Sequence, residues 1–141
     1  MANIFKIMES FNEKYKKRSY DFAVRLVKYC MRLRKEGVPY DLFSQLLKAG
    51  TSFPANFRAA TQARSDAEYY SKLCISVEEG DETIFWLYLL EDAGLAKSDD
   101  ELIFLQQESQ ELVNVFSEVK RKKAKRMGKY YRNPSYQPPH T

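Results

Sequence analysis

The stretch VKRKKAKRMGKYYR, residues 119–132, combines closely spaced cations with two adjacent tyrosines. Lysine and arginine pair with phosphates and tyrosine rings stack on unpaired bases, so this run indicates contact with RNA or single-stranded DNA. A structural alternative exists, because cations near a helix C-terminus also suit the helix dipole. The candidate nucleic-acid contacts of this basic run are Lys120, Arg121, Lys122, Lys123, Lys125, Arg126, Lys129, Tyr130, Tyr131 and Arg132.

A second basic feature lies nearer the N-terminus, where cations recur on one side of an expected helix. At 100° per residue they fall together, interrupted only by Asp21, and opposite an apolar face. Two independent basic features favour a polyanionic partner, and nucleic acid is the first candidate. The members of this basic stripe are Arg18, Arg25, Lys28, Arg32 and Lys35.

Residue combinations for catalysis or metal binding are missing from the sequence. The single histidine, His140, cannot complete a Ser-His-Asp or Cys-His set. Glu78 and Glu82 share a helix face, but a solvated acidic face explains them better than a metal site, because no histidine accompanies them. The two cysteines, Cys30 and Cys74, show no zinc or redox spacing, so we expect reduced, packed thiols. The sequence predicts a protein that is not an enzyme and holds no metal and no cofactor.

The segment IFWLYLL, residues 84–90, is apolar on every side of the expected helix. A helix in a lone four-helix bundle needs only one apolar stripe, so something must cover a second face. Phe85, Trp86 and Leu89 are the candidates for a subunit interface. Burial within the monomer, including burial under the N-terminal segment, is the alternative.

Composition limits the 141-residue chain to one small, mostly helical domain. Five glycines and five prolines supply too few turns for an all-β domain. The net charge of +4 is divided unequally, since residues 120–141 carry eight Lys/Arg and no acid, which leaves 15 basic and 19 acidic side chains in residues 1–119. No signal peptide and no apolar run of roughly 18 residues is present, so we expect a cytoplasmic protein without a membrane partner.

Four helices with short connections are expected. The first covers about residues 18–36 and ends at Gly37, with an apolar face of Tyr20, Ala23, Val24, Val27, Cys30 and Met31. The second runs through Gly50 and Pro54 as one kinked helix, because its apolar positions keep their helical phase across the proline. The third ends at Gly94. Capping boxes predict the starts of the last two helices, at Ser65 with Glu68 and at Ser98 with Glu101.

This pattern predicts the all-α class, as an antiparallel up-down four-helix bundle with long third and fourth helices and a basic C-terminal extension. The fourth helix is expected to end near Gly128. Three regions follow: residues 1–17 as an N-terminal arm or short helix, 18–127 as the bundle, and 128–141 as a Tyr/Pro-rich tail.

Several short segments occur in an order and spacing that resemble a known family, the four-helix-bundle proteins encoded in intervening sequences of bacterial 23S rRNA genes. The resemblance covers roughly residues 18–118 and departs from the commoner pattern at Phe53-Pro54, where an aliphatic residue and often glycine stand. The tail is also longer than usual. The segments are SYDFA at 19–23, QLLKAGTS at 45–52, AN at 55–56, KLCI at 72–75, ETIFWL at 82–87 and AGL at 93–95.

The resemblance implies a ring-shaped homo-oligomer, a pentamer, with no catalytic residues to carry over. The same fold is similar to the accessory variability determinant of diversity-generating retroelements, a basic pentameric barrel that binds a reverse transcriptase and nucleic acid. A reverse transcriptase is therefore a second expected partner besides RNA or DNA.

Three functions follow from these observations. The leading one is a non-enzymatic oligomeric scaffold that binds RNA or single-stranded DNA through the basic stripe and the basic run. The second is an accessory subunit that docks on a reverse transcriptase through its tail. The third is a structural protein-interaction oligomer, in which Arg25 and Arg32 of one subunit meet Glu78 and Glu82 of the next.

Overall fold

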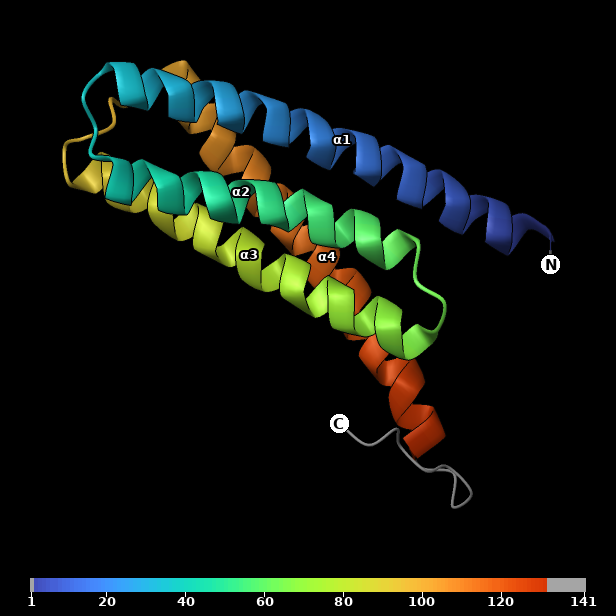
Figure 1. The fold of residues 1–141 in the computed structure, drawn as a ribbon. Coiled ribbons are helices and arrows are strands. Elements are labelled where there is room, and N and C mark those ends of the chain that lie inside the picture. The colour runs from blue at the N-terminus through green and yellow to red at the C-terminus, as the bar shows by residue number, and fades with distance from the viewer. Residues whose placement is uncertain (1, 132–141) are drawn as a thin grey trace.

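The chain forms an all-α, antiparallel four-helix bundle, as its sequence predicts (Figure 1). The computed structural model describes residues 2–131, apart from the side chains of residues 2, 5 and 129–131. Each helix packs against its neighbours in chain order, and α1 and α4 close the bundle with the least packing of the four pairs. The helices are α1 (Ala2–Lys35), α2 (Tyr40–Thr61), α3 (Asp66–Asp92) and α4 (Asp100–Tyr131).

The helix α1 is one continuous helix of 34 residues, so residues 1–17 do not form the separate arm or short helix that we expected. No glycine or proline interrupts residues 2–35. Early turns of α1 are also held by the bundle, since the ring of Tyr15 lies 6.2 Å from that of Phe116 on α4. The helix ends as predicted at Gly37, whose φ of 87° allows the Val38 N–H to reach the Leu33 carbonyl at 3.0 Å.

The face of α1 that enters the core differs in part from the expected one. Cys30 of the predicted face is buried, but Tyr20 and Val24 are exposed, and Phe22 and Leu26 are buried instead. Both sides of this helix carry apolar residues at helical spacing, so periodicity alone could not choose between them. Phenylalanine and leucine fill more of the space between four helices than alanine and valine do.

The helix α2 passes through Pro54 without a break, which confirms the prediction of a single helix. The Thr51 hydroxyl donates to the Leu47 carbonyl at 2.8 Å, one turn before the proline. Gly50 has a packing role here, since a Cβ at this position would lie 2.0 Å from Leu26 Cδ2 on α1. The bend expected at Gly50 and Pro54 stays a prediction.

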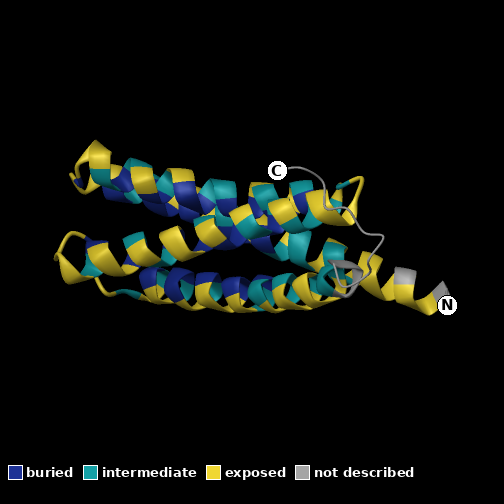
Figure 2. Cartoon of the chain, turned by 90° about the horizontal axis from the view of Figure 1, so that it is seen from below, coloured by how far each residue is buried: buried dark blue, intermediate teal, exposed yellow. Residues whose placement is uncertain are grey.

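The centre of the core is aromatic, and its rings come from α2 and α4. Figure 2 shows the buried positions along the inner sides of the helices. The rings of Phe57 and Phe116 stack at 4.1 Å, and Phe53 meets Phe116 edge-on at 5.5 Å. Gly80 of α3 gives these helices room, because a Cβ there would lie 2.5 Å from Val113 Cγ2 and 2.9 Å from the Phe53 ring. The narrow spacing of these helices therefore depends on a glycine in the middle of α3.

The two predicted helix starts have different outcomes. Ser65 caps α3 as expected, with its hydroxyl accepting from the Glu68 N–H at 3.1 Å. Ser98 does not cap α4, because Asp99 takes that position and accepts from the Leu102 N–H at 3.0 Å. The Ser98 hydroxyl instead donates to Glu91 at 2.7 Å. A negatively charged acceptor one residue later is the better cap, because it also interacts favourably with the positive end of the helix dipole.

The helix α3 ends as predicted at Gly94, which has a φ of 74°. By contrast, α4 continues through Gly128 to Tyr131, so its expected end and the start of the expected tail are wrong. A glycine inside a helix costs only about 1 kcal/mol relative to alanine, which is too little to end a long helix. The predicted tail from residue 132 onward lies outside the described residues.

Candidate nucleic-acid interface

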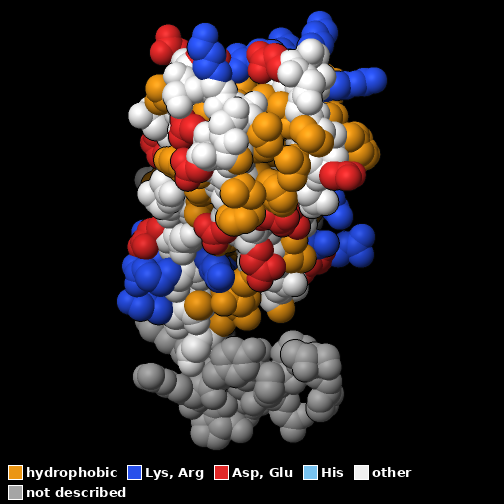
Figure 3. Space-filling view, turned by 90° about the vertical axis from the view of Figure 1, so that its left-hand side faces the viewer, with side chains coloured by type: hydrophobic (Ala, Val, Ile, Leu, Met, Phe, Trp, Pro, Cys, Tyr) orange, Lys and Arg blue, Asp and Glu red, His pale blue; other side chains and the backbone are white. Residues whose placement is uncertain are grey.

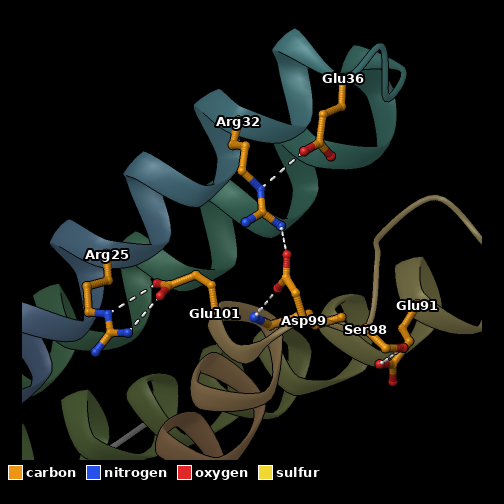
Figure 4. Close-up of polar contacts among 8 residues, drawn as sticks. Arg25, Arg32, Glu36, Glu91, Ser98, Asp99 and Glu101 are labelled. Atoms are coloured by element: carbon orange, nitrogen blue, oxygen red, sulfur yellow. Dashed lines mark hydrogen bonds and ion pairs between the residues drawn. The ribbon is translucent and has the colours of Figure 1, made fainter.

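The basic stripe of α1 faces the acidic first half of α4. Arg18 Nε donates to Glu108 Oε2 at 3.0 Å, its Nη2 contacts the same carboxylate, and Nη2 also lies 3.0 Å from Glu111 Oε2. Further along α1, Arg25 donates to both carboxylate oxygens of Glu101, at 3.1 and 2.7 Å (Figure 4). These bonds raise the pKa of both guanidinium groups, so the arginines stay charged and paired.

Arg32 continues the series where α1 ends and α4 begins (Figure 4). Its Nη2 donates to Asp99 Oδ2 at 2.7 Å, while Nε lies 3.3 Å from Glu36 Oε1. The pKa of Asp99 is lowered, first because the Leu102 N–H donates to its carboxylate and then because of Arg32, and burial only partly opposes this. One carboxylate therefore caps α4 and ties it to α1.

Three of the five stripe residues are thus paired within the chain. Within the chain the partners of Arg25 and Arg32 are Glu101 and Asp99. The expected pairing of these arginines with Glu78 and Glu82 of a second subunit stays a prediction. The sequence held a signal for the pairing within the chain. Arginines seven residues apart on α1 match acids spaced along α4 in the reverse direction, as antiparallel neighbours require.

Two members of the stripe remain exposed. Lys28 and Lys35 point into solvent, and neither forms an ion pair with another described residue. By contrast, the paired Arg25 makes a second contact with α4, because its guanidinium lies 3.5 Å from the centroid of the Phe104 ring. The stripe therefore offers two free cations to a partner, and not five.

The basic run on α4 is also divided between paired and free cations. Arg121 bonds Glu118 through Nε at 3.0 Å and Nη2 at 2.5 Å, one turn away on the same helix. Lys123 Nζ lies 2.5 Å from Asp66 Oδ1 and 5.1 Å from the Tyr69 ring centroid, and its side chain is largely buried. These two side chains are held by the bundle.

The other cations of the run are open to solvent. Lys122, Lys125 and Arg126 are exposed, Lys120 is half-buried, and none of them forms an ion pair with another described residue. The side chains predicted from Lys129, Tyr130 and Tyr131, and all of Arg132, lie outside the described residues. Free positive charge therefore gathers on the last described turns of α4.

The predicted interface residues on α3 divide in a similar way. Phe85 is 56% exposed and Leu89 is exposed, whereas Trp86 is half-buried and packs on the core, with its Nε1 donating to Glu82 at 3.4 Å. Tyr88, which we did not predict, is exposed beside them. Apolar side chains gather on the face at the end of the bundle where α3 finishes (Figure 3). We define the α3 patch as Phe85, Trp86, Tyr88 and Leu89.

A second apolar surface lies on the outer side of α1. Tyr20 is 63% exposed, and Val24 and Val27 follow it at helical spacing with more than a third of their surfaces exposed. We define this outer stripe as Tyr20, Val24 and Val27. Helical periodicity in the sequence predicted that these residues face the core, whereas in the structure they are exposed.

The described part of the chain also bears on metal binding and on thiol reactivity. Residues 2–131 contain no group of three potential metal-ligating side chains. Cys30 and Cys74 are free cysteines, and burial raises the pKa of the Cys30 thiol to about 12, which keeps it protonated. None of the described helices has an apolar stretch long enough to traverse a bilayer.

Comparison with known proteins places these features in a family context. A sequence profile described as 23S rRNA-intervening sequence protein matches residues 12–118. The solved structure of a Bacteroides thetaiotaomicron protein of unknown function from the S23 ribosomal protein family is 31% identical, with a TM-score of 0.73. The alignment covers 78% of this chain and 97% of that one. No curated protein matches the sequence. The expected relationship to the retroelement accessory protein stays a prediction.

Proposed function

The chain belongs to the 23S rRNA-intervening sequence protein family, and from that premise we propose that it is a non-enzymatic, oligomeric scaffold that binds RNA or single-stranded DNA. The observation that supports this most is the cluster of free cations on the last turns of α4. Lys122, Lys125 and Arg126 are exposed and have no ion-pair partner among the described residues. Such cations are available to exchange their counterions for phosphates.

The binding surface that we propose is smaller than the sequence suggested. The paired arginines of α1 would have to leave Glu101, Glu108 and Asp99 before they could reach a phosphate. Lys28 and Lys35 need no such exchange, but they belong to the second half of α1. The end of α1 lies at the opposite end of the bundle from the last turns of α4 (Figure 1). The basic end of α4 is therefore the main contact, and the paired part of the stripe serves the fold.

The oligomer that we propose uses the two exposed apolar surfaces. The helices α1 and α3 lie across the bundle from each other, so the outer stripe and the α3 patch face in different directions (Figure 1). Two different apolar surfaces on one chain suit a heterologous, head-to-tail contact, which closes into a ring when the rotation between subunits allows it. A ring would place several basic ends around one axis and raise their combined affinity.

The experiment that tests nucleic-acid binding is fluorescence anisotropy with labelled RNA and single-stranded DNA across a salt series. A variant with Lys122→Glu and Lys125→Glu is compared with one carrying Lys28→Glu and Lys35→Glu, which makes the same charge change on α1. We expect the α4 variant to lose most of the affinity and to have a shallower slope, since each phosphate contact adds about −0.7 for a single strand. Absence of binding at low salt would contradict the proposal.

A further inference from the structure

A groove opens between the first turns of α1 and the last turns of α4, where the two helices diverge (Figure 1). It has a volume of about 270 Å³. Ile7, Met8 and Phe11 line it from α1, Val119 lines it from α4, and Tyr69 at the start of α3 lines it from beneath. The floor of the groove is therefore apolar and is contributed by three helices.

The apolar residues on the α1 side have no cover among the described residues. Ile7 is 66% exposed and Met8 is 43% exposed, and both continue the helical spacing of Phe11 and Tyr15, which pack on the bundle. Figure 2 shows these first turns as an exposed segment that extends past the rest of the bundle. The core-facing stripe of α1 thus continues into its first turns, where its apolar side chains are left largely exposed.

The rim of the groove is positively charged. Lys122 and Arg126 line it from α4 and are exposed. Lys123 also lines the groove, but its ammonium group is paired with Asp66. No aspartate or glutamate lines it among the described residues. An apolar floor with free cations along one side selects for a partner that is apolar on one face and acidic beside it.

We propose that this groove binds an acidic amphipathic helix of a partner protein. Apolar side chains at i, i+3, i+4 and i+7 of that helix lie on Ile7, Met8 and Val119, in the manner of helix-in-groove recognition. Its acidic side chains meet Lys122 and Arg126. The docked helix lies along α1 and α4, where these two helices diverge.

Other occupants fit the groove less well. A second copy of the chain that docked symmetrically would bring the same cations against Lys122 and Arg126. Residues 132–141 contain an arginine and no acid, so this segment also lacks the complementary charge. Nucleic acid would satisfy the rim, but the rings of Phe11 and Tyr69 pack against the core, and the exposed floor residues Ile7 and Met8 are aliphatic, whereas base stacking needs accessible flat rings. The inference concerns a protein partner and goes beyond the proposed nucleic-acid contact.

The test uses the full chain and a labelled synthetic helix of about 18 residues, with leucine at the four anchor positions of each apolar repeat and glutamate elsewhere. A matched peptide carries lysine in place of every glutamate. We expect the acidic peptide to bind and the basic one not to. Ile7→Asp should weaken binding by about tenfold or more, because it places a charge in the apolar floor. Arg126→Glu should weaken it as well.

Ile103→Asp provides the matched control, since Ile103 is an exposed isoleucine on α4 away from the groove, and this change should leave peptide affinity unaltered. Circular dichroism shows whether each variant keeps its helix content. The proposal is overturned if both peptides bind equally, or if Ile7→Asp binds as the unmodified chain does. It is also overturned if Ile7→Asp weakens RNA binding or self-association while the acidic peptide never binds, since the groove then holds a different occupant.

Discussion

Arg32 Nη2 and Asp99 Oδ2, 2.7 Å apart, join the last turn of α1 to the residue that caps α4. The contact links α1 and α4, the two neighbouring helices that pack least closely in the bundle. Because the same carboxylate accepts the Leu102 N–H, losing it affects both the helix start and the connection between helices. Asp99 is therefore the polar residue of this end on which stability should depend most.

Replacing Asp99 should separate its two roles. Asp99→Ala removes the cap and the ion pair, and we expect it to lower the free energy of unfolding by about 1 kcal/mol or more. Asp99→Asn keeps a capping oxygen and should cost less. Ser98→Ala is the matched control, and its effect should be small because Ser98 does not cap α4. Urea unfolding followed by circular dichroism measures all three, and a larger loss for Ser98→Ala would contradict the capping assignment.

The lowered pKa of Asp99 predicts an acid-sensitive contribution to stability. A carboxyl group whose pKa is lower in the folded state stabilises the fold above its unfolded pKa, about 3.9, and that contribution disappears as the pH falls through the folded pKa. As the pH falls below 5, the free energy of unfolding should therefore decrease more for the unmodified chain than for Asp99→Asn. Urea midpoints across this range provide the measurement, and parallel curves for the two proteins would show that Asp99 does not contribute.

Gly80 should tolerate no side chain. The Cβ of Gly80→Ala would lie 2.5 Å from Val113 Cγ2 and 2.9 Å from the Phe53 ring, so the packed core must shift, at a cost of about 1–3 kcal/mol. Gly128→Ala is the matched control, since nothing lies within 4 Å of its Cβ. Alanine there should stabilise α4 by about 0.5–1 kcal/mol. Thermal unfolding of both variants shows whether the changes have opposite signs.

The fold was predictable because long helical patterns and helix-ending glycines are local signals. Gly37 and Gly94 end helices as expected, and Ser65 caps α3. The burial of α1 was not predictable in the same way, because apolar residues occupy two of its faces and only packing selects Phe22 and Leu26. Local pattern cannot supply a choice that depends on three other helices.

The candidate site was only partly predictable for a related reason. The sequence identifies cations but not their neighbours, so Arg25 and Lys125 look equivalent in it. The structure separates them, because Arg25 pairs with Glu101 across the bundle, whereas Lys125 forms no ion pair with another described residue. Whether a charge is free depends on the register between α1 and α4, which is a long-range property.

Arg25 should therefore matter for stability and not for nucleic-acid binding. Arg25→Gln removes the two bonds to Glu101 and the contact with the Phe104 ring, so unfolding should need less urea. Its RNA affinity and salt slope should match those of the unmodified chain. A clear loss of RNA affinity in anisotropy, with an unchanged urea midpoint, would reverse our assignment of the basic stripe to the fold.

The two apolar surfaces predict a specific pattern of self-association. Val24→Asp damages the outer stripe and Leu89→Asp damages the α3 patch, so each variant alone should lose the oligomer in light scattering. If the contact is heterologous, each variant keeps one sound surface, and mixing the two should produce a heterodimer with a single intact junction. Ile103→Asp should leave the assembly unchanged. A monomeric unmodified chain at micromolar concentration would remove the basis of this prediction.

The uneven distribution of charge along α4 should orient an approaching polyanion before any contact forms. Acids occupy its first half, where they neutralise α1, and cations occupy its last turns, so positive potential is concentrated at one end of an elongated molecule. A polyanion approaching through dilute salt exerts a torque on such a charge distribution and turns that end toward itself. Encounters are thereby oriented at distances of about a Debye length, roughly 10 Å at 0.1 M salt, and the association rate falls as ionic strength shortens that range.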